Sequence, residues 1–540
     1  MQGGQWQKAL ALFTAMPQAS LSPDVISYNT AISACATGGQ WKEALNLCSA
    51  MPTATDTSPD VISYNAAITA CDKGGQWQQA LILFEAMPKA KICPNVVSYN
   101  VAISACEKGH QWQGALTLFN AMPRSKTSQD VISYSSAISA CQTGGQWQDA
   151  LALFEALPKA KIQPDVISYN ATISACETGS QWEKALVFFV GMSEARVNPD
   201  VVSYSSAIRA CEKGGQWQKA CILFTSIPQA NISPNIISYN AAIGACEKGS
   251  QWEVALALFE VLPNAKISPN VVSYNIAISV CEQGGRWQDV LVLFEVLPKA
   301  NVSPDAITYN ATMSACQKGG QWKKALLLFG GLPEAKIRPD VVGYSASISA
   351  CEKGCQWEGA LALFEAMPMA DISPNIISYN AAISACEKGC QWQGALVLFK
   401  AMPKAKICPN AISYNAAISA CEKGGQWPAA LVFLGAMCMV RVCPDDISYN
   451  SAITACSKGG HWQEALILLR AMPNAKITPD VISYSLAVSA CERGCQPRQT
   501  MVLFGAMPQA EILAATGHDM GGLTAGGCRL TSNPTTPCIF

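Results

Sequence analysis

Charge is scarce in this sequence of 540 residues. Only 14% of the residues are Asp, Glu, Lys or Arg, and the formal net charge is −1. A protein that binds polyanions nonspecifically needs a surplus of Lys and Arg, so that class is disfavoured, although a local basic stripe is still compatible. Half of the residues are hydrophobic, yet no apolar run reaches the roughly 18 residues that span a bilayer.

Several catalytic motifs are also missing. The chain has no Gly-Lys dipeptide, which excludes a phosphate-binding P-loop, and no Gly-x-Ser-x-Gly or Cys-x-x-Cys. His110, His461 and His518 are its only histidines, and none lies in a His-x-Glu context, which excludes a zinc deaminase domain. Pairs one helical turn apart, such as Cys106 and His110, offer too few ligands for a stable metal site. We therefore expect no enzyme, no cofactor and no metal.

Cysteine is abundant, with 25 residues, and 14 of them recur in one register from Cys35 to Cys491. Disulfide frameworks are typical of short secreted chains with a signal peptide, and this sequence shows neither property. We expect the recurring Cys to be a small buried thiol.

The organising feature is a repeat. Trp recurs from Trp6 to Trp462 every 35 residues, with a single interval of 36 after Trp41, and Tyr keeps the same register from Tyr28 to Tyr484. No Trp or Tyr lies outside these two columns. A fixed period of this size predicts a stacked array of one supersecondary unit rather than unrelated domains.

The unit Val61–Asn95 shows what is repeated. Apolar residues spaced by three and four predict a first helix over Ser63–Lys73, here named helix A, and Gly74-Gly75 ends it. A second helix, helix B, begins at Gln76 with a wide apolar face, and Pro88 is expected to stop it. Small residues in helix A allow close approach of neighbouring A helices, so we expect helix A on the concave wall and helix B on the convex wall.

The repeats suggest the following organisation. Residues 1–24 hold a partial repeat with helix B only, which indicates a truncated sequence or a minimal cap, and residues 25–480 hold thirteen complete repeats. Residues 481–513 form a degenerate repeat in which Pro497 replaces Trp, and the Gly-, Thr- and Pro-rich residues 514–540 are expected to be disordered.

These motifs resemble the pentatricopeptide repeat, in its class of uniform 35-residue units. The resemblance depends on Pro-Asp-Val-Ile-Ser-Tyr-Asn at the unit start, Ala-Leu-x-Leu-Phe in helix B, and Pro-Asp or Pro-Asn at the end. It implies an all-α, right-handed α–α superhelical solenoid of tandem helix–turn–helix hairpins that binds single-stranded RNA, one base per repeat. Trp at the start of helix B and the Pro near its end depart from the family pattern, which should alter curvature more than binding.

The resemblance assigns base reading to the fifth and the last residue of each repeat. In each column only two residue types occur, and the pairs are Asn29 and Asp60, Asn65 and Asn95, Asn100 and Asp130, Ser135 and Asp165, Asn170 and Asp200, Ser205 and Asn235, Asn240 and Asn270, Asn275 and Asp305, Asn310 and Asp340, Ser345 and Asn375, Asn380 and Asn410, Asn415 and Asp445, and Asn450 and Asp480. The alternative is that the Asn or Ser at the fifth position merely caps or decorates helix A. Against it, the Ser two residues earlier is expected to serve as the cap already.

The chemistry of the pairs agrees with the family's code. Asn reaches a small pyrimidine and Ser leaves room for a purine, while Asp accepts from the imino N–H of uracil or guanine and Asn donates to the ring acceptor of cytosine or adenine. The thirteen complete repeats then predict the target 5′-UCUGUACUUACUU-3′.

Two further columns follow from the resemblance. The second residue of each repeat should sandwich bases, with ordinary core packing as the alternative: Ile26, Ile62, Val97, Ile132, Ile167, Val202, Ile237, Val272, Ile307, Val342, Ile377, Ile412 and Ile447. Lysines before the Gly turn should face phosphates, with a favourable cation at a helix C-terminus as the alternative: Lys73, Lys108, Lys213, Lys248, Lys318, Lys353, Lys388, Lys423 and Lys458.

The favoured function is a nonenzymatic RNA-binding adaptor in organellar RNA processing, stability or translation. The family points to the mitochondrion or chloroplast, although the N-terminus does not resemble a transit peptide. The second hypothesis is a protein-interaction scaffold of the tetratricopeptide type, which would not require the two restricted columns.

Overall fold

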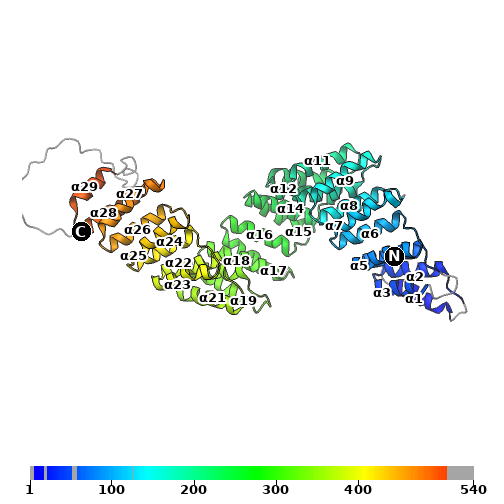
Figure 1. The fold of residues 1–540 in the computed structure, drawn as a ribbon, viewed down its shortest axis with the longest axis horizontal. Coiled ribbons are helices and arrows are strands. Elements are labelled where there is room, and N and C mark those ends of the chain that lie inside the picture. The colour runs from blue at the N-terminus through cyan, green and yellow to red at the C-terminus, as the bar shows by residue number, and fades with distance from the viewer. Residues whose placement is uncertain (1–4, 18–20, 52–57, 126, 507–540) are drawn as a thin grey trace, which may run out of the picture. The chain divides into compact units, whose positions relative to one another are not determined.

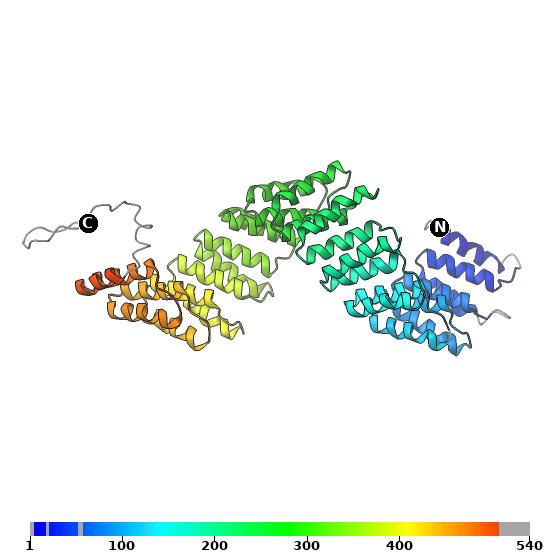
Figure 2. The same ribbon diagram turned by 90° about the horizontal axis from the view of Figure 1, so that it is seen from above.

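The protein is described by a computed structural model that covers residues 5–17, 21–51, 58–125 and 127–506, and every regular element in these ranges is a helix (Figure 1). The chain divides into two compact units, one of residues 1–284 and 299–302 and the other of residues 285–298 and 303–540. Within each unit, helical hairpins stack side by side, as a second view shows (Figure 2). The all-helical class expected from the sequence is confirmed. Within the described ranges no helix is long and apolar enough to cross a membrane.

The helices alternate between the two types. The A helices are α2 (Val25–Thr37), α4 (Val61–Lys73), α6 (Val96–Lys108), α8 (Val131–Thr143), α10 (Val166–Thr178), α12 (Val201–Lys213), α14 (Ile236–Lys248), α16 (Val271–Gln283), α18 (Ala306–Lys318), α20 (Val341–Lys353), α22 (Ile376–Lys388), α24 (Ala411–Lys423), α26 (Asp446–Lys458) and α28 (Val481–Arg493). The B helices are α1 (Gln5–Ala15), α3 (Trp41–Ala50), α5 (Trp77–Lys89), α7 (Trp112–Ala121), α9 (Trp147–Lys159), α11 (Trp182–Glu194), α13 (Trp217–Gln229), α15 (Trp252–Asn264), α17 (Trp287–Lys299), α19 (Trp322–Gly331), α21 (Trp357–Met369), α23 (Trp392–Lys404), α25 (Trp427–Met439), α27 (Trp462–Ala471) and α29 (Pro497–Ala506). Two short 3₁₀ turns, η3 (Pro123–Ser125) and η4 (Pro473–Ala475), follow α7 and α27.

Helix A begins where the last residue of the preceding repeat caps it. Asp60 Oδ1 accepts from the Ser63 backbone N–H at 2.8 Å, and the Asp60 N–H donates to Ser63 Oγ at 3.1 Å, which is a capping box. In every A helix from α2 to α28, the side chain of an Asp or Asn accepts from the backbone N–H of the third helical residue. The expectation that Ser is the cap was wrong, because Ser63 is already the third helical residue.

A left-handed residue separates helix A from helix B. Gly75 has φ +69°, and at the equivalent place His110, Cys355 and Cys390 adopt φ between 54° and 55°, a region that costs a non-glycine residue energy. Cysteine therefore takes the place of a turn glycine at Cys355 and Cys390.

Helix B continues through its proline in some repeats and ends before it in others. The helix α5 continues through Pro88 to Lys89, since a proline in the last turn forfeits only one hydrogen bond. Termination comes from Lys91, whose φ of 59° is left-handed and whose N–H donates to the Pro88 carbonyl at 3.0 Å. The expectation that Pro88 ends the helix was therefore wrong by one residue in α5, whereas in α3, α7 and α27 the α-helix does end before the Pro.

Within each unit, successive repeats pack against each other through helix A. The recurring Cys is buried in every A helix, and alanines such as Ala67 and Ala70 are fully buried, so neighbouring A helices of a unit lie in direct contact. The expected buried thiol is confirmed. Where the preceding B helix has a Phe at this position, the ring meets the Tyr of helix A edge-on, as in Phe84 and Tyr99, whose ring centroids lie 4.9 Å apart. Cys48, Leu434 and Leu469 replace the Phe before Tyr64, Tyr449 and Tyr484.

The Trp column has a partner that the sequence did not reveal. The indole of Trp41 lies against Gly74 of the next repeat, where an added Cβ would fall 2.6 Å from ring Cδ1. The same relation recurs between each Trp and the first turn glycine that follows in the next repeat, through Trp462 and Gly494. Glycine is needed at this place because the ring occupies the space of a side chain.

Candidate functional site

The fifth and last residues of a repeat lie side by side. Asn170 Nδ2 donates to Asp200 Oδ1 at 3.1 Å. Asn170 lies in α10, whereas Asp200 caps the start of the next A helix, α12. Equivalent bonds join Asn29 to Asp60, Asn65 to Asn95, Asn100 to Asp130, Asn240 to Asn270, Asn310 to Asp340, Asn380 to Asn410, and Asn415 to Asp445, at 3.0–3.5 Å. Stacking of A helices thus brings together residues that are 30 or 31 positions apart.

Capping determines which atom of the last residue is left for another partner. Asp200 Oδ1 accepts from the backbone N–H of Ser203 at 2.8 Å, and Asn95 Oδ1 does the same for Ser98 at 3.0 Å. A backbone N–H requires an acceptor, so the amide of Asn95 must turn its oxygen to the helix. The remaining atom is then a carboxylate oxygen in Asp200 and an amide N–H₂ in Asn95.

The amide of the fifth residue is oriented as well. Ser203 Oγ donates to Asn170 Oδ1 at 2.6 Å, while Asn170 Nδ2 faces Asp200. In the same way, a serine of the next A helix donates from its Oγ to the side-chain oxygen of Asn29, Asn100, Asn380, Asn415 and Asn450. One N–H of Asn170 therefore remains beside the second oxygen of Asp200.

Where the fifth residue is Ser, the side chain lies deeper. Ser135, Ser205 and Ser345 are all buried, and Ser205 Oγ donates to the Val201 carbonyl of its own helix at 2.7 Å. The shorter side chain leaves more space above the helix than Asn does.

The second residue of each repeat is exposed. All thirteen aliphatic side chains of this column, from Ile26 to Ile447, are 48–72% exposed. The alternative of core packing is therefore wrong for this column. An unpartnered β-branched side chain at the same place in every repeat is a surface that a flat apolar ligand can cover.

A hollow of about 400 Å³ brings these features together. Ile167 and Val202, from α10 and α12, line it together with the pair Asn170 and Asp200. Arg209 lines it too, and its guanidinium lies 3.4 Å from Glu177. Sequence reasoning missed Arg209, although it is the single charged residue in a column that otherwise holds Ser, Thr or Gly.

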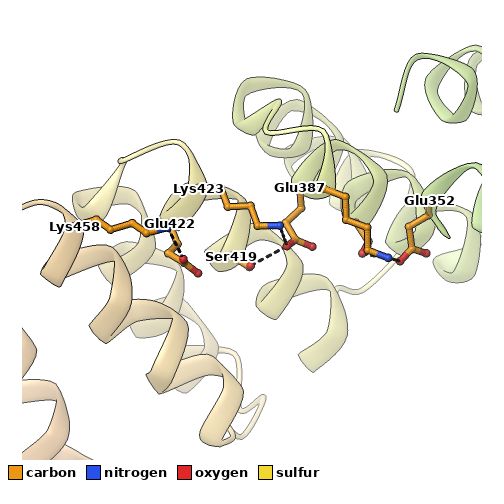
Figure 3. A network of polar contacts seen from close by, with 8 residues as sticks. Glu352, Glu387, Ser419, Glu422, Lys423 and Lys458 are labelled. Carbon is orange, nitrogen blue, oxygen red and sulfur yellow. Dashed lines mark hydrogen bonds and ion pairs between the residues drawn. The ribbon is translucent and has the colours of Figure 1, made fainter. Parts of the chain in front are cut away.

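The lysine column forms ion pairs between repeats. Lys388, Lys423 and Lys458 each contact the Glu one repeat earlier, Glu352, Glu387 and Glu422, at 2.8–2.9 Å (Figure 3). Ser419 also donates to Glu387 at 3.0 Å (Figure 3). In the first unit, Lys108, Lys213 and Lys248 pair likewise with Asp72, Glu177 and Glu212. The acidic partners, which the sequence analysis missed, offset the positive charge of these six of the nine lysines in the expected basic stripe.

Hydrogen bonds hold several of the capping carboxylates, Asp200 among them, in the ionised form. Burial raises the pKa of Asp200, but hydrogen bonds from the Ser203 backbone, the Ser203 hydroxyl and Asn170 outweigh it, so the pKa is lowered overall. The same balance lowers the pKa of Asp60, Asp130, Asp445 and Asp480. These residues therefore present an acceptor at neutral pH. Among the described residues no group of three His, Cys, Asp or Glu could hold a metal ion.

Family models of the PPR, or pentatricopeptide, repeat match most of the chain. The PPR repeat family matches residues 59–108, 94–143, 164–213, 199–248, 234–283, 269–318, 339–388, 374–423 and 444–493, and the PPR repeat matches residues 26–54, 132–162, 307–337 and 412–441. The chain belongs to the PPR family. No curated protein matches this PPR protein.

Among solved structures, this PPR protein is similar to PPR10 from maize, with 20% identity and a TM-score of 0.56 over 94% of this chain and 88% of that one. PPR10 in complex with an 18-nt psaJ RNA element matches at 21% identity and a TM-score of 0.43, covering 96% and 83% of the two chains. Yeast Rmd9p with a 16-nt target RNA matches at 10% identity and a TM-score of 0.32, over 88% and 94%. The first match supports the solenoid fold of stacked hairpins.

Proposed function

We propose that this PPR protein binds single-stranded RNA in a sequence-specific way, one base per repeat, and that it acts without catalysis of its own. The observation that carries the proposal is the hollow at α10 and α12. Its two exposed aliphatic walls, Ile167 and Val202, fit the faces of a base, and Asn170 and Asp200 offer a donor and an acceptor to the edge of that base. PPR10, a pentatricopeptide repeat protein with the same fold, is solved in complex with RNA, which agrees with this ligand class.

The cap explains why Asp and Asn would select different bases. With Oδ1 committed to the helix, Asp200 has an acceptor left for the imino N–H of uracil, whereas Asn95 has a donor left for the ring nitrogen of cytosine. Because the backbone enforces the orientation, Asn95 cannot flip to imitate Asp. The pairs with Ser, such as Ser205 and Asn235, leave room for a purine. With one base assigned to each of the thirteen repeats, the proposed target is 5′-UCUGUACUUACUU-3′.

Binding at fixed salt to this 13-mer and to its complement tests the proposal. We expect the 13-mer to bind at least tenfold tighter, equivalent to about 1.4 kcal/mol. Equal or absent binding to both would favour the protein-interaction scaffold. Ser205→Asn should change the preference at the sixth base from A to C in a binding-and-sequencing selection, and an unchanged preference there would refute the assignment of the reading columns.

The cellular role follows from occupancy of an RNA segment. A bound solenoid blocks a nuclease or prevents a hairpin, so we propose a role in RNA stability, processing or translation in the mitochondrion or chloroplast. Crosslinking of the protein to RNA in cells, followed by sequencing, should recover segments that contain the target. Recovery of cytosolic transcripts alone would contradict the organellar role.

A further inference from the structure

Two thiols of adjacent repeats are in contact. Cys221 Sγ of α13 lies 3.4 Å from Cys246 Sγ of α14, with Cys246 fully buried and Cys221 half-buried. Cys246 belongs to the Cys column that every repeat has. Cys221 replaces a Leu that the equivalent B-helix position holds in the other repeats, as at Leu186 and Leu256, apart from Met501 in the degenerate last repeat.

The replacement is specific to one junction. At every other junction from helix B to the next helix A, the equivalent B-helix position holds a leucine, which carries no sulfur. At the junction between α13 and α14, the sulfur atoms lie 3.4 Å apart and must approach by about 1.4 Å to reach the bond length of a disulfide. The helices themselves need not separate, because the thiols already touch.

We propose that Cys221 and Cys246 form a reversible intramolecular disulfide that clamps helix B of one repeat to helix A of the next. The oxidant is a low-molecular-weight disulfide. The Cys221 thiolate attacks one of its sulfurs and expels a thiolate, and the Cys246 thiolate then attacks the Cys221 sulfur and expels the second. Two protein thiols lose two protons and two electrons, and the small disulfide is reduced to two thiols.

The chemistry of the two groups suits this order. The hydrogen bond with Cys246 lowers the pKa of Cys221 to about 7, so a thiolate is available near neutral pH, and the same bond together with burial raises the pKa of Cys246. The half-buried Cys221 is the thiol that a small disulfide can reach, and the fully buried Cys246 is the one that completes the bond.

The sequence offers a direct assay. Cleavage after Lys219 and Lys248 releases the peptide Ala220–Lys248, whose only cysteines are Cys221 and Cys246. The folded full-length protein is equilibrated with glutathione buffers of rising oxidised fraction, quenched in acid, unfolded, alkylated, digested and weighed. We expect this peptide to lose both alkyl groups together at a ratio at which the other buried column cysteines keep theirs.

Two variants sharpen the assay. In Cys221→Leu, Cys246 should stay fully alkylated at every ratio. In Leu186→Cys with Cys221→Leu, the new thiol should instead link to Cys211, because it stands in the same register one repeat earlier. The oxidised wild-type protein should also unfold at a higher temperature than the reduced one, and this difference should vanish in Cys221→Leu.

The proposal is overturned if the peptide keeps both alkyl groups at the most oxidising ratio. It is also overturned if Cys221 carries glutathione while Cys246 remains alkylated, or if the bond closes equally well in urea, where the stacked helices no longer hold the thiols together.

Discussion

Trp322 of α19 lies against Gly354, the residue that ends α20 in the next repeat, so closely that a Cβ added to Gly354 would fall 2.7 Å from ring Cγ. The φ of Gly354 is −80°, which any residue adopts, so the space and not the backbone demands glycine. Trp at the start of helix B and glycine at the end of the next helix A are therefore one coupled feature of this solenoid.

The substitution Gly354→Ala should accordingly destabilise the second unit, by about 1–3 kcal/mol, as expected for overpacking. Chemical unfolding of the full chain, followed by circular dichroism, measures the change. Gly330→Ala is the matched control: Gly330 lies in α19 with open space around its Cα, so alanine should stabilise by about 0.5–1 kcal/mol. Similar effects of the two substitutions would disprove the role given to Trp322.

A second prediction concerns base selection at Asp200. Asp200→Asn should change the preferred fifth base from U to C while stability changes by less than about 0.5 kcal/mol, because Asn caps equally well in other repeats. Asp200→Ala should lose about 1 kcal/mol of stability together with the preference. A selection from randomised RNA compares the variants, and a retained U in Asp200→Asn would contradict the orientation argument.

Acid should weaken the fold through its caps. Asp60, Asp130, Asp200, Asp445 and Asp480 have a lowered pKa in the folded chain, so their contribution is present above the ordinary Asp pKa of about 3.9 and is lost as the pH falls through the folded value. Replacing all five by Asn keeps an acceptor at each cap and should flatten the dependence of the unfolding free energy on pH in that interval. An identical slope in both proteins would show that other carboxyl groups cause the loss.

Arg209 should add to RNA affinity at one repeat. It lines the hollow beside Asn170, so Arg209→Ser should weaken binding and reduce the slope of log affinity against log salt by about 0.7, the value for one contact with a single strand. Lys404→Ser, at the exposed end of the B helix α23, removes the same charge and should leave that slope unchanged. A titration in fluorescence anisotropy at several salt concentrations separates the two.

Removing the acidic partners of the paired lysines should strengthen RNA binding, in contrast to the loss of Arg209. Glu387→Gln together with Glu422→Gln leaves Lys423 and Lys458 without their carboxylates, so binding should tighten and depend more steeply on salt if these lysines face phosphate. Stability should fall by at most about 1 kcal/mol for each exposed pair. The control Glu365→Gln changes an exposed residue of α21. Unchanged affinity in the double variant would indicate that these lysines hold neighbouring repeats together and do not contact RNA.

Local pattern was sufficient for much of the fold because each hairpin is encoded within its own 35 residues. The spacing of Tyr64, Ala67, Ile68 and Cys71 predicted α4 and its buried face, and the Gly-Gly pair predicted the turn. Pro88 misled because a proline in the last turn forfeits only one hydrogen bond and therefore does not by itself stop a helix.

The sequence by itself determined the repeat, the helix type, the buried Cys column and the membership in the PPR family, since these depend on periodicity and on motifs within one unit. Only the tertiary structure decided what one repeat does to the next. In the structure, the last residue of the repeat, Asp200, caps the next A helix beside Asn170, and Ile167 is exposed. Lys423 forms an ion pair with Glu387, and Cys221 contacts Cys246. The physical reason is that these contacts join residues of different repeats, whose relative placement follows from packing of the shared core and not from the order of residues along the chain.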